Sequence, residues 1–172
     1  TIDPASTFVN EGTLRAQSGA FINFVPGSYT FTAPAVAGPG GIVYFTNGTH
    51  TGLIDSEGTG VCRVNATGAG TAFNTLTNLG ELEFPNDTDA VFSGTLTNQG
   101  LIEMLATANP TDFYLSSSLL LTGGGTITLS NSVNNQFYDV TGANQRRILT
   151  NADNTIQGSG RIGLNTINVV NQ

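Results

Sequence analysis

The chain has 172 residues, enough for one domain with a sizeable core, and we treat residues 1–172 as a single domain. It is rich in Gly, Asn and Thr and lacks Lys, and only 10% of its residues are charged, against about a quarter in typical soluble domains. Its net charge of −7 argues against binding to nucleic acid or to anionic membrane surfaces. No apolar run reaches transmembrane length, so we expect no membrane insertion.

The first part of the chain reads as short strands separated by turns. Alternating apolar and polar side chains predict strands at residues 20–25 and 29–32. The segment 33–41 is rich in Ala, Pro and Gly and predicts a protruding loop. Residues 42–47 resume the strand pattern, whereas residues 48–71 combine Gly and Thr with short apolar pairs and define no clear element.

The middle of the chain contains one phrase twice. Residues 74–84 read Asn-Thr-Leu-Thr-Asn-Leu-Gly-Glu-Leu-Glu-Phe, and residues 94–104 read Gly-Thr-Leu-Thr-Asn-Gln-Gly-Leu-Ile-Glu-Met. The offset between the two copies is a period of about 20 residues, within the range of known structural repeats. Each copy ends in a strand of alternating apolar and polar residues. Residues 106–112 follow as a second predicted loop.

The last third of the chain is again a series of short strands between Asn and Gly turns. The predicted strands lie at residues 119–121, 126–129, 148–149, 155–156, 161–162 and 167–169. No window of the chain places apolar residues at i, i+3 and i+4, as an amphipathic helix would. We therefore expect an all-β protein.

The core of the repeated phrase, an apolar residue, a small or β-branched residue and then Asn, recurs along the whole chain. Its Asn residues are Asn10, Asn47, Asn78, Asn98, Asn131, Asn151 and Asn171. Three of the six intervals between them equal the offset of the doubled phrase, and the longer intervals leave room for insertions. A repeat of this length with short strands is typical of one coil of a parallel β-solenoid. The chain would form about seven or eight coils, with loop insertions and no evident caps.

The recurring Asn and Gly residues have structural roles in this hypothesis. We expect the seven Asn residues to occupy the same corner of successive coils, where Asn tolerates the left-handed conformation and can bond the Asn of the neighbouring coil. Gly12, Gly80 and Gly100 follow two residues after three of these Asn residues. We expect a positive φ at these glycines, where the backbone turns into the next strand.

The phrase Leu-Thr-Asn-x-Gly and the segment 154–163 (Asn-Thr-Ile-Gln-Gly-Ser-Gly-Arg-Ile-Gly) resemble the degenerate repeats of bacterial surface solenoids. These are the autotransporter passenger domains and the filamentous-haemagglutinin-like exoproteins. The resemblance covers about half of the chain. It implies a right-handed parallel β-helix that is exported to the cell surface and has an adhesive, scaffolding or filament-forming role.

The two ends of the chain and its single cysteine are consistent with such a protein. The chain starts almost directly with a repeat phrase and stops at Asn171-Gln172, and no cap is recognisable at either end. Because an open coil exposes unpaired strand edges, we expect either head-to-tail pairing with other copies or a longer solenoid from which this segment comes. Cys62 has no partner for an internal disulfide and lies in a predicted strand.

One group of acidic residues offers an enzymatic or ligand-binding alternative. Glu81 and Glu83 alternate along one predicted strand, and Asp87 and Asp89 flank the turn that follows it. These four residues are candidates for a glycan or calcium site, as in a polysaccharide-binding or polysaccharide-cleaving β-helix of the pectate-lyase type. A solvated strand face explains the same pattern without a ligand. With one His and one Cys, the chain offers no zinc or haem motif, and we assign no catalytic residue, metal ligand or cofactor.

A second alternative is an ice-binding solenoid, which would use flat rows of Thr-x-Thr. The chain has five such pairs, and composition alone predicts roughly four among 25 Thr residues. Our sequence-based hypothesis is therefore an extracellular structural or adhesive β-solenoid at the cell surface, whose partner is another copy of itself or a glycan or surface.

Overall fold

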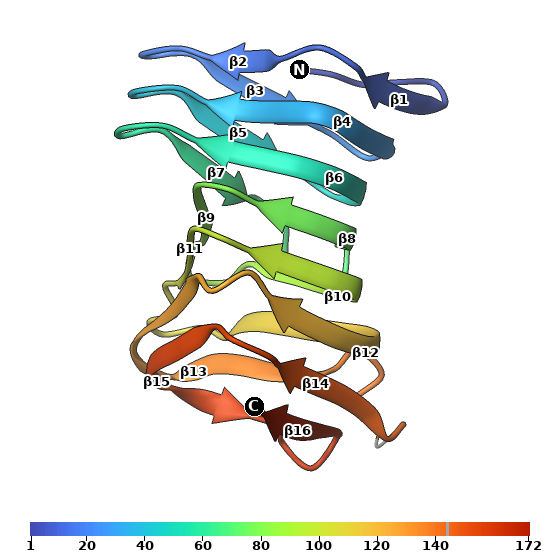
Figure 1. Ribbon diagram of the computed structural model, residues 1–172, viewed down its shortest axis with the longest axis vertical. Helices are drawn as coiled ribbons and strands as arrows, with labels where there is room; N and C mark the ends of the chain where they lie inside the picture. Colours follow the sequence, from blue (N-terminus) through green and yellow to red (C-terminus); the bar gives the residue numbers. More distant parts are fainter. Residues whose placement is uncertain (144) are drawn as a thin grey trace.

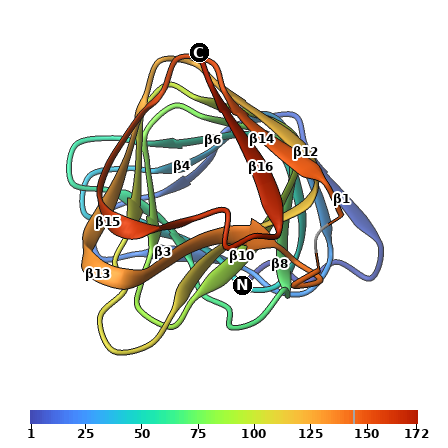
Figure 2. The same ribbon diagram turned by 90° about the horizontal axis from the view of Figure 1, so that it is seen from below.

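The computed structural model describes residues 1–143 and 145–172, and these residues form strands and turns without a helix. The chain winds into a parallel β-solenoid of about eight turns, as predicted. The coils stack along one axis, with the N-terminus at one end of the column and the C-terminus near the other (Figure 1). Seen along that axis, the column is a triangular prism, and its coils wind in the right-handed sense (Figure 2).

The three faces of the prism are each a stack of parallel strands. Face A consists of β1 (Thr7–Asn10), the first parts of β4 (Ser28–Ala37), β6 (Gly48–Ser56), β8 (Thr71–Asn78), β10 (Asp89–Asn98) and β12 (Thr111–Thr122), the second part of β13 (Thr126–Asp139) and the end of β15 (Thr155–Ile162). Face B consists of β2 (Leu14–Ala16), the second parts of β4, β6, β8, β10 and β12, and then β14 (Arg147–Asn151) and β16 (Ile167–Asn171). Face C consists of β3 (Phe21–Phe24), β5 (Ile42–Phe45), β7 (Val61–Val64), β9 (Glu81–Phe84), β11 (Leu101–Met104) and the first parts of β13 and β15.

Alternation along each strand sends every second side chain into the prism. On face C the strands β5, β7, β9 and β11 each alternate between half-buried and fully buried residues. Behind face A the inward side chains form an aromatic ladder in which Tyr29, His50, Phe73 and Phe92 occupy the same position in four successive coils. The ladder continues at a neighbouring position, where the ring of Phe113 lies 3.9 Å from that of Phe92 and parallel to it. One continuous core therefore runs through the column.

The predicted loop at 33–41 is wrong for its first half. The strand β4 continues to Ala37, and Ala35 within it is fully buried. Pro34 is compatible with this strand because it lies at the corner between faces A and B. The ladder between β4 and β6 is interrupted there, between Phe31 and Ala35, so the missing N–H of proline removes no ladder hydrogen bond.

The corner between faces C and A carries the turns of most varied length. They span residues 46–47, 65–70, 85–88 and 105–110 in four successive coils. The second predicted loop, 106–112, falls on the last of these turns, and its final two residues already belong to β12. The unequal lengths make this corner irregular, whereas the strands on the three faces stay in register.

The seven Asn residues of the repeat do not share one corner. Asn78, Asn98, Asn151 and Asn171 lie where face B ends before face C, Asn10 lies between faces A and B, and Asn47 and Asn131 lie between faces C and A. Where they stack, they bond as expected: the Asn78 amide donates to Asn98 at 2.8 Å. Only Asn47 has a positive φ, of 61°. The prediction that these Asn residues adopt the left-handed conformation is therefore wrong for the other six, whose φ is not positive.

The three glycines of the repeat, Gly12, Gly80 and Gly100, do not have the positive φ that was predicted for them. A Cβ at Gly100 would lie 2.0 Å from the carbonyl oxygen of Gly80, and one at Gly80 would lie 2.2 Å from the backbone nitrogen of Ser56. These two positions need Gly because successive coils approach closely there. A Cβ at Gly12 would have nothing within 4 Å.

Candidate functional site

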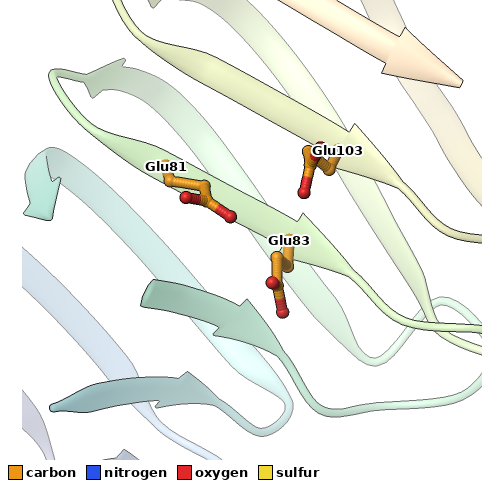
Figure 3. A group of neighbouring side chains, drawn as sticks. All are labelled: Glu81, Glu83 and Glu103. Carbon is orange, nitrogen blue, oxygen red and sulfur yellow. The ribbon is translucent and has the colours of Figure 1, made fainter. Parts of the chain in front are cut away.

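Three glutamates gather on the outer surface of face C. Glu81 and Glu83 point outward from β9 on either side of the fully buried Leu82. In the next coil Glu103 lies in register with Glu83. One carboxylate oxygen from each glutamate can be chosen so that all three lie within 4.8 Å of one another, and Figure 3 shows the three side chains on adjacent strands. We call Glu81, Glu83 and Glu103 the face C carboxylates.

An arginine in the preceding coil balances part of this charge. Arg63 lies in register with Glu83, and its Nε donates a hydrogen bond of 2.6 Å to the Glu83 carboxylate. Nη2 of the same guanidinium forms an ion pair with this carboxylate. Glu83 is the more buried partner, with 13% of its side chain exposed. The pair leaves Glu81 and Glu103 without a described cationic partner, so the group carries net negative charge.

The negative charge of the group affects the pKa of Glu81. Partial burial raises the pKa of this carboxyl above its usual value, and the neighbouring charges of Glu103 and then Glu83 raise it further. A raised pKa means that Glu81 takes up a proton, or benefits from a cation, more readily than an isolated surface carboxylate.

The other two predicted site residues lie elsewhere. Asp87 sits in the turn at the corner between faces C and A, with a φ of 67°. Asp89 starts β10 on face A and is only 8% exposed. The chain turns a corner between Glu83 and Asp89, so four residues that are close in sequence divide between two faces of the prism. They do not form a single site.

Asp89 belongs instead to a second acidic group on face A, which the sequence pattern did not indicate. It lies in register with Asp112 of the next coil, and its Oδ1 accepts the backbone N–H of Asp112 at 3.2 Å. The hydroxyls of Tyr114 and Tyr138 lie 2.9 and 3.1 Å from Asp112 Oδ2. Burial raises the pKa of Asp89 to about 6, and the charge of Asp112 adds to the shift. Both residues are nearly fully buried, so this group is poorly placed to reach a ligand.

The face C carboxylates are chemically suited to hold a hard divalent cation. Carboxylate oxygens are the preferred ligands of Ca²⁺, and a cation at this surface could accept further oxygens from a second molecule. Sequence reasoning named Glu81 and Glu83 but did not place Glu103 or Arg63 beside them. The repeat contained the signal for both, because Arg63 and Glu103 lie one repeat before and one repeat after Glu83.

Comparisons with protein-family models, with curated proteins and with solved structures find no match to this chain. The described residues include no helix capable of crossing a membrane. The fold defines the molecule as a β-solenoid.

Proposed function

We propose that this β-solenoid is a rod-forming segment of an extracellular surface fibre or adhesin, whose coils continue by stacking on further coils. The observation that carries the proposal is the open core at the C-terminal end of the column. Val169 lies in register with the fully buried Leu149, and Ile162 with the fully buried Phe137. Both therefore occupy core positions, yet 48% of Val169 and 40% of Ile162 is exposed.

Strand edges at both ends support the same proposal. Among the described residues, β1 pairs only with β4 at one end of the column, and β16 pairs only with β14 at the other. Free edges of parallel strands are templates for pairing with a further strand. Head-to-tail stacking would place β16 on β2 of the next copy, and the end of β15 on β1, because each pair shares a face. It would also bury the open core, and contacts of this heterologous kind build open filaments. The resemblance of the repeats to bacterial surface solenoids agrees with an exported rod.

The test is the assembly state of the purified chain over a wide range of concentrations. Sedimentation velocity should show association that grows with concentration, and negative-stain electron microscopy should show fibres of uniform width. Val169→Lys should weaken this association, because it places a charge on the open core. Val133→Lys is the matched control, since Val133 is 52% exposed at a lateral corner of the column. A chain that stays monomeric at high concentration, or that responds equally to both substitutions, would contradict stacking between copies.

A second candidate function is the binding of an acidic polysaccharide through a cation on face C. The compact group of three carboxylates favours it, because Ca²⁺ could bridge these glutamates and the carboxylates of a uronic acid polymer. Calorimetric titration with Ca²⁺ should give saturable binding that is lost in a variant with Glu81→Gln and Glu103→Gln. Glu11→Gln, at an exposed turn far from the group, should leave it unchanged. Cleavage of such a polymer that disappears with Glu81→Gln and Glu83→Gln would extend this candidate to an enzyme.

A further inference from the structure

A small polar pocket opens at the corner between faces C and A, away from the face C carboxylates and next to Asp89 of the second acidic group. Its volume is about 300 Å³, and it is lined by Asn47, Asn65, Ala66, Thr67 and Thr88. We call it the corner pocket. It arises because the turns that meet there differ in length: residues 46–47 join their strands directly, whereas residues 65–70 project beyond them.

The floor of the pocket is held in an unusual backbone conformation by buried neighbours. Asn47 has a φ of 61° and is followed by Gly48 at 87°. The N–H of Asn47 donates to Thr71 Oγ1 at 3.1 Å, and its carbonyl oxygen lies 3.0 Å from His50 Nε2. Burial lowers the pKa of His50 to about 4, so the ring is neutral and its Nε2 carries the proton that bonds Asn47. A strained residue fixed from several sides is a common feature of binding sites.

The projecting turn is also anchored. The N–H of Gly68 donates to the Asp89 carboxylate. The Asn65 amide donates to Thr46 Oγ1 at 3.2 Å, and the Thr88 hydroxyl donates to the Pro85 carbonyl at 2.7 Å. The walls of the pocket are therefore preorganised, which lowers the entropy lost when a ligand binds.

Several hydrogen-bonding groups in the lining remain available. Among the described residues, the side-chain amide of Asn47, Oδ1 of Asn65 and the hydroxyl of Thr67 have no hydrogen-bond partner. Gly70 adds to this arrangement, because any Cβ there would lie 2.1 Å from Asn47 Oδ1. The pocket thus offers amide and hydroxyl groups in fixed positions, next to the methyl groups of Ala66 and the two threonines.

We propose that the corner pocket binds a neutral sugar unit, either a free mono- or disaccharide or the end of a glycan. None of the lining side chains is charged, and the net charge of −7 disfavours anionic ligands. Amides and hydroxyls beside small apolar groups match the hydroxyls and the C–H surfaces of a sugar ring. The volume lies at the low end of the range for small-molecule pockets, about 300–1,000 Å³. This site goes beyond the proposed rod function and gives the rod a lateral ligand.

The test is a titration of the full chain with neutral hexoses, N-acetylhexosamines and their disaccharides, followed by saturation-transfer NMR and calorimetry. At least one of these sugars should bind saturably and more tightly than the corresponding uronic acid. Thr67→Val removes the hydroxyl and keeps the shape of the side chain, and it should weaken binding about three- to tenfold, as expected for one hydrogen bond. Asn47→Gly removes the amide while keeping a residue that tolerates a positive φ, and it should weaken binding to a similar extent.

The control is Asn165→Gly, because Asn165 has nearly the same φ of 60° but lies in the last coil, remote from the pocket. It should bind the sugar as the native chain does. With Ca²⁺ removed, so that face C cannot hold a uronic acid through the cation, the proposal is overturned if no neutral sugar binds saturably, if the uronic acid binds better, or if the two pocket variants bind as tightly as the control. Sedimentation of the same variants should be unchanged, so a failure here and a failure of stacking between copies are distinguishable.

Discussion

Replacing Gly100 by Ala tests how closely the coils are stacked. The added Cβ would lie 2.0 Å from the carbonyl oxygen of Gly80, where ordinary contact begins at 3.4 Å, so the backbone of one coil must shift by more than 1 Å. The same carbonyl accepts a ladder hydrogen bond of 2.8 Å from the N–H of Leu101, which the shift would lengthen. Overpacking costs about 1–3 kcal/mol and a weakened backbone hydrogen bond about 1 kcal/mol. We therefore expect Gly100→Ala to lower the free energy of unfolding by about 3 kcal/mol.

Gly12→Ala is the matched control, since Gly12 holds the same place in the repeated phrase. A Cβ there has nothing within 4 Å, and the φ of Gly12 is not positive. Alanine should stabilise the chain slightly, by about 0.5 kcal/mol, because it restricts the unfolded state.

Urea unfolding followed by circular dichroism measures both free energies. In a thermal scan, Gly100→Ala should lower Tm by about 6–12 °C for a chain of this size. If Gly100→Ala stays within about 1 kcal/mol of the native chain, or if Gly12→Ala is equally destabilised, the close approach of the coils does not explain these glycines.

Three further predictions concern buried polar groups. Asn98→Ala should lower the free energy of unfolding by about 3 kcal/mol, because it leaves its buried partners Asn78 and Asn154 without this hydrogen bond. Asn131→Ala, at an exposed corner, should change the free energy of unfolding by less than about 0.5 kcal/mol. Equal losses in the two variants would refute the buried ladder. Because the pKa of His50 is lowered to about 4 from about 6.5, the unfolded chain binds this proton first as the pH falls, and stability that is complete above pH 6.5 should decrease towards pH 4 by up to about 3 kcal/mol. The raised pKa of Asp89 changes the stability in the opposite direction over the same pH interval. The measurement is therefore the difference in unfolding free energy between His50→Phe and the native chain, at pH 7 and at pH 4.5. A difference that is the same at both pH values would contradict the lowered pKa of His50. Cys62 is fully buried and burial raises its pKa to about 12, so a thiol reagent should label it only after unfolding in urea; rapid labelling of the folded chain would be inconsistent with this burial.

The acidic candidates show why a site is harder to predict than a fold. Adjacency in sequence grouped Glu83 with Asp89, but a corner of the prism lies between them and places them on different faces. The contacts that matter run between coils, where Arg63 and Glu103 flank Glu83 from the strands on either side. The corner pocket was not predictable either, because it depends on how far one turn projects beyond its neighbour in the stack.

The sequence by itself determined the class of structure. A phrase that recurs at a fixed offset, with strand alternation and turns of Asn and Gly, is a local pattern, and a local pattern repeated along the chain can satisfy its buried faces only by stacking. The tertiary structure alone decided what each copy of the phrase does. Asn98 is buried and bonded whereas Asn131 is exposed. A Cβ at Gly100 would collide with the backbone of the neighbouring coil, whereas one at Gly12 would have nothing within 4 Å. The reason is that insertions change the length of individual coils, so identical phrases fall at different corners and meet different neighbours.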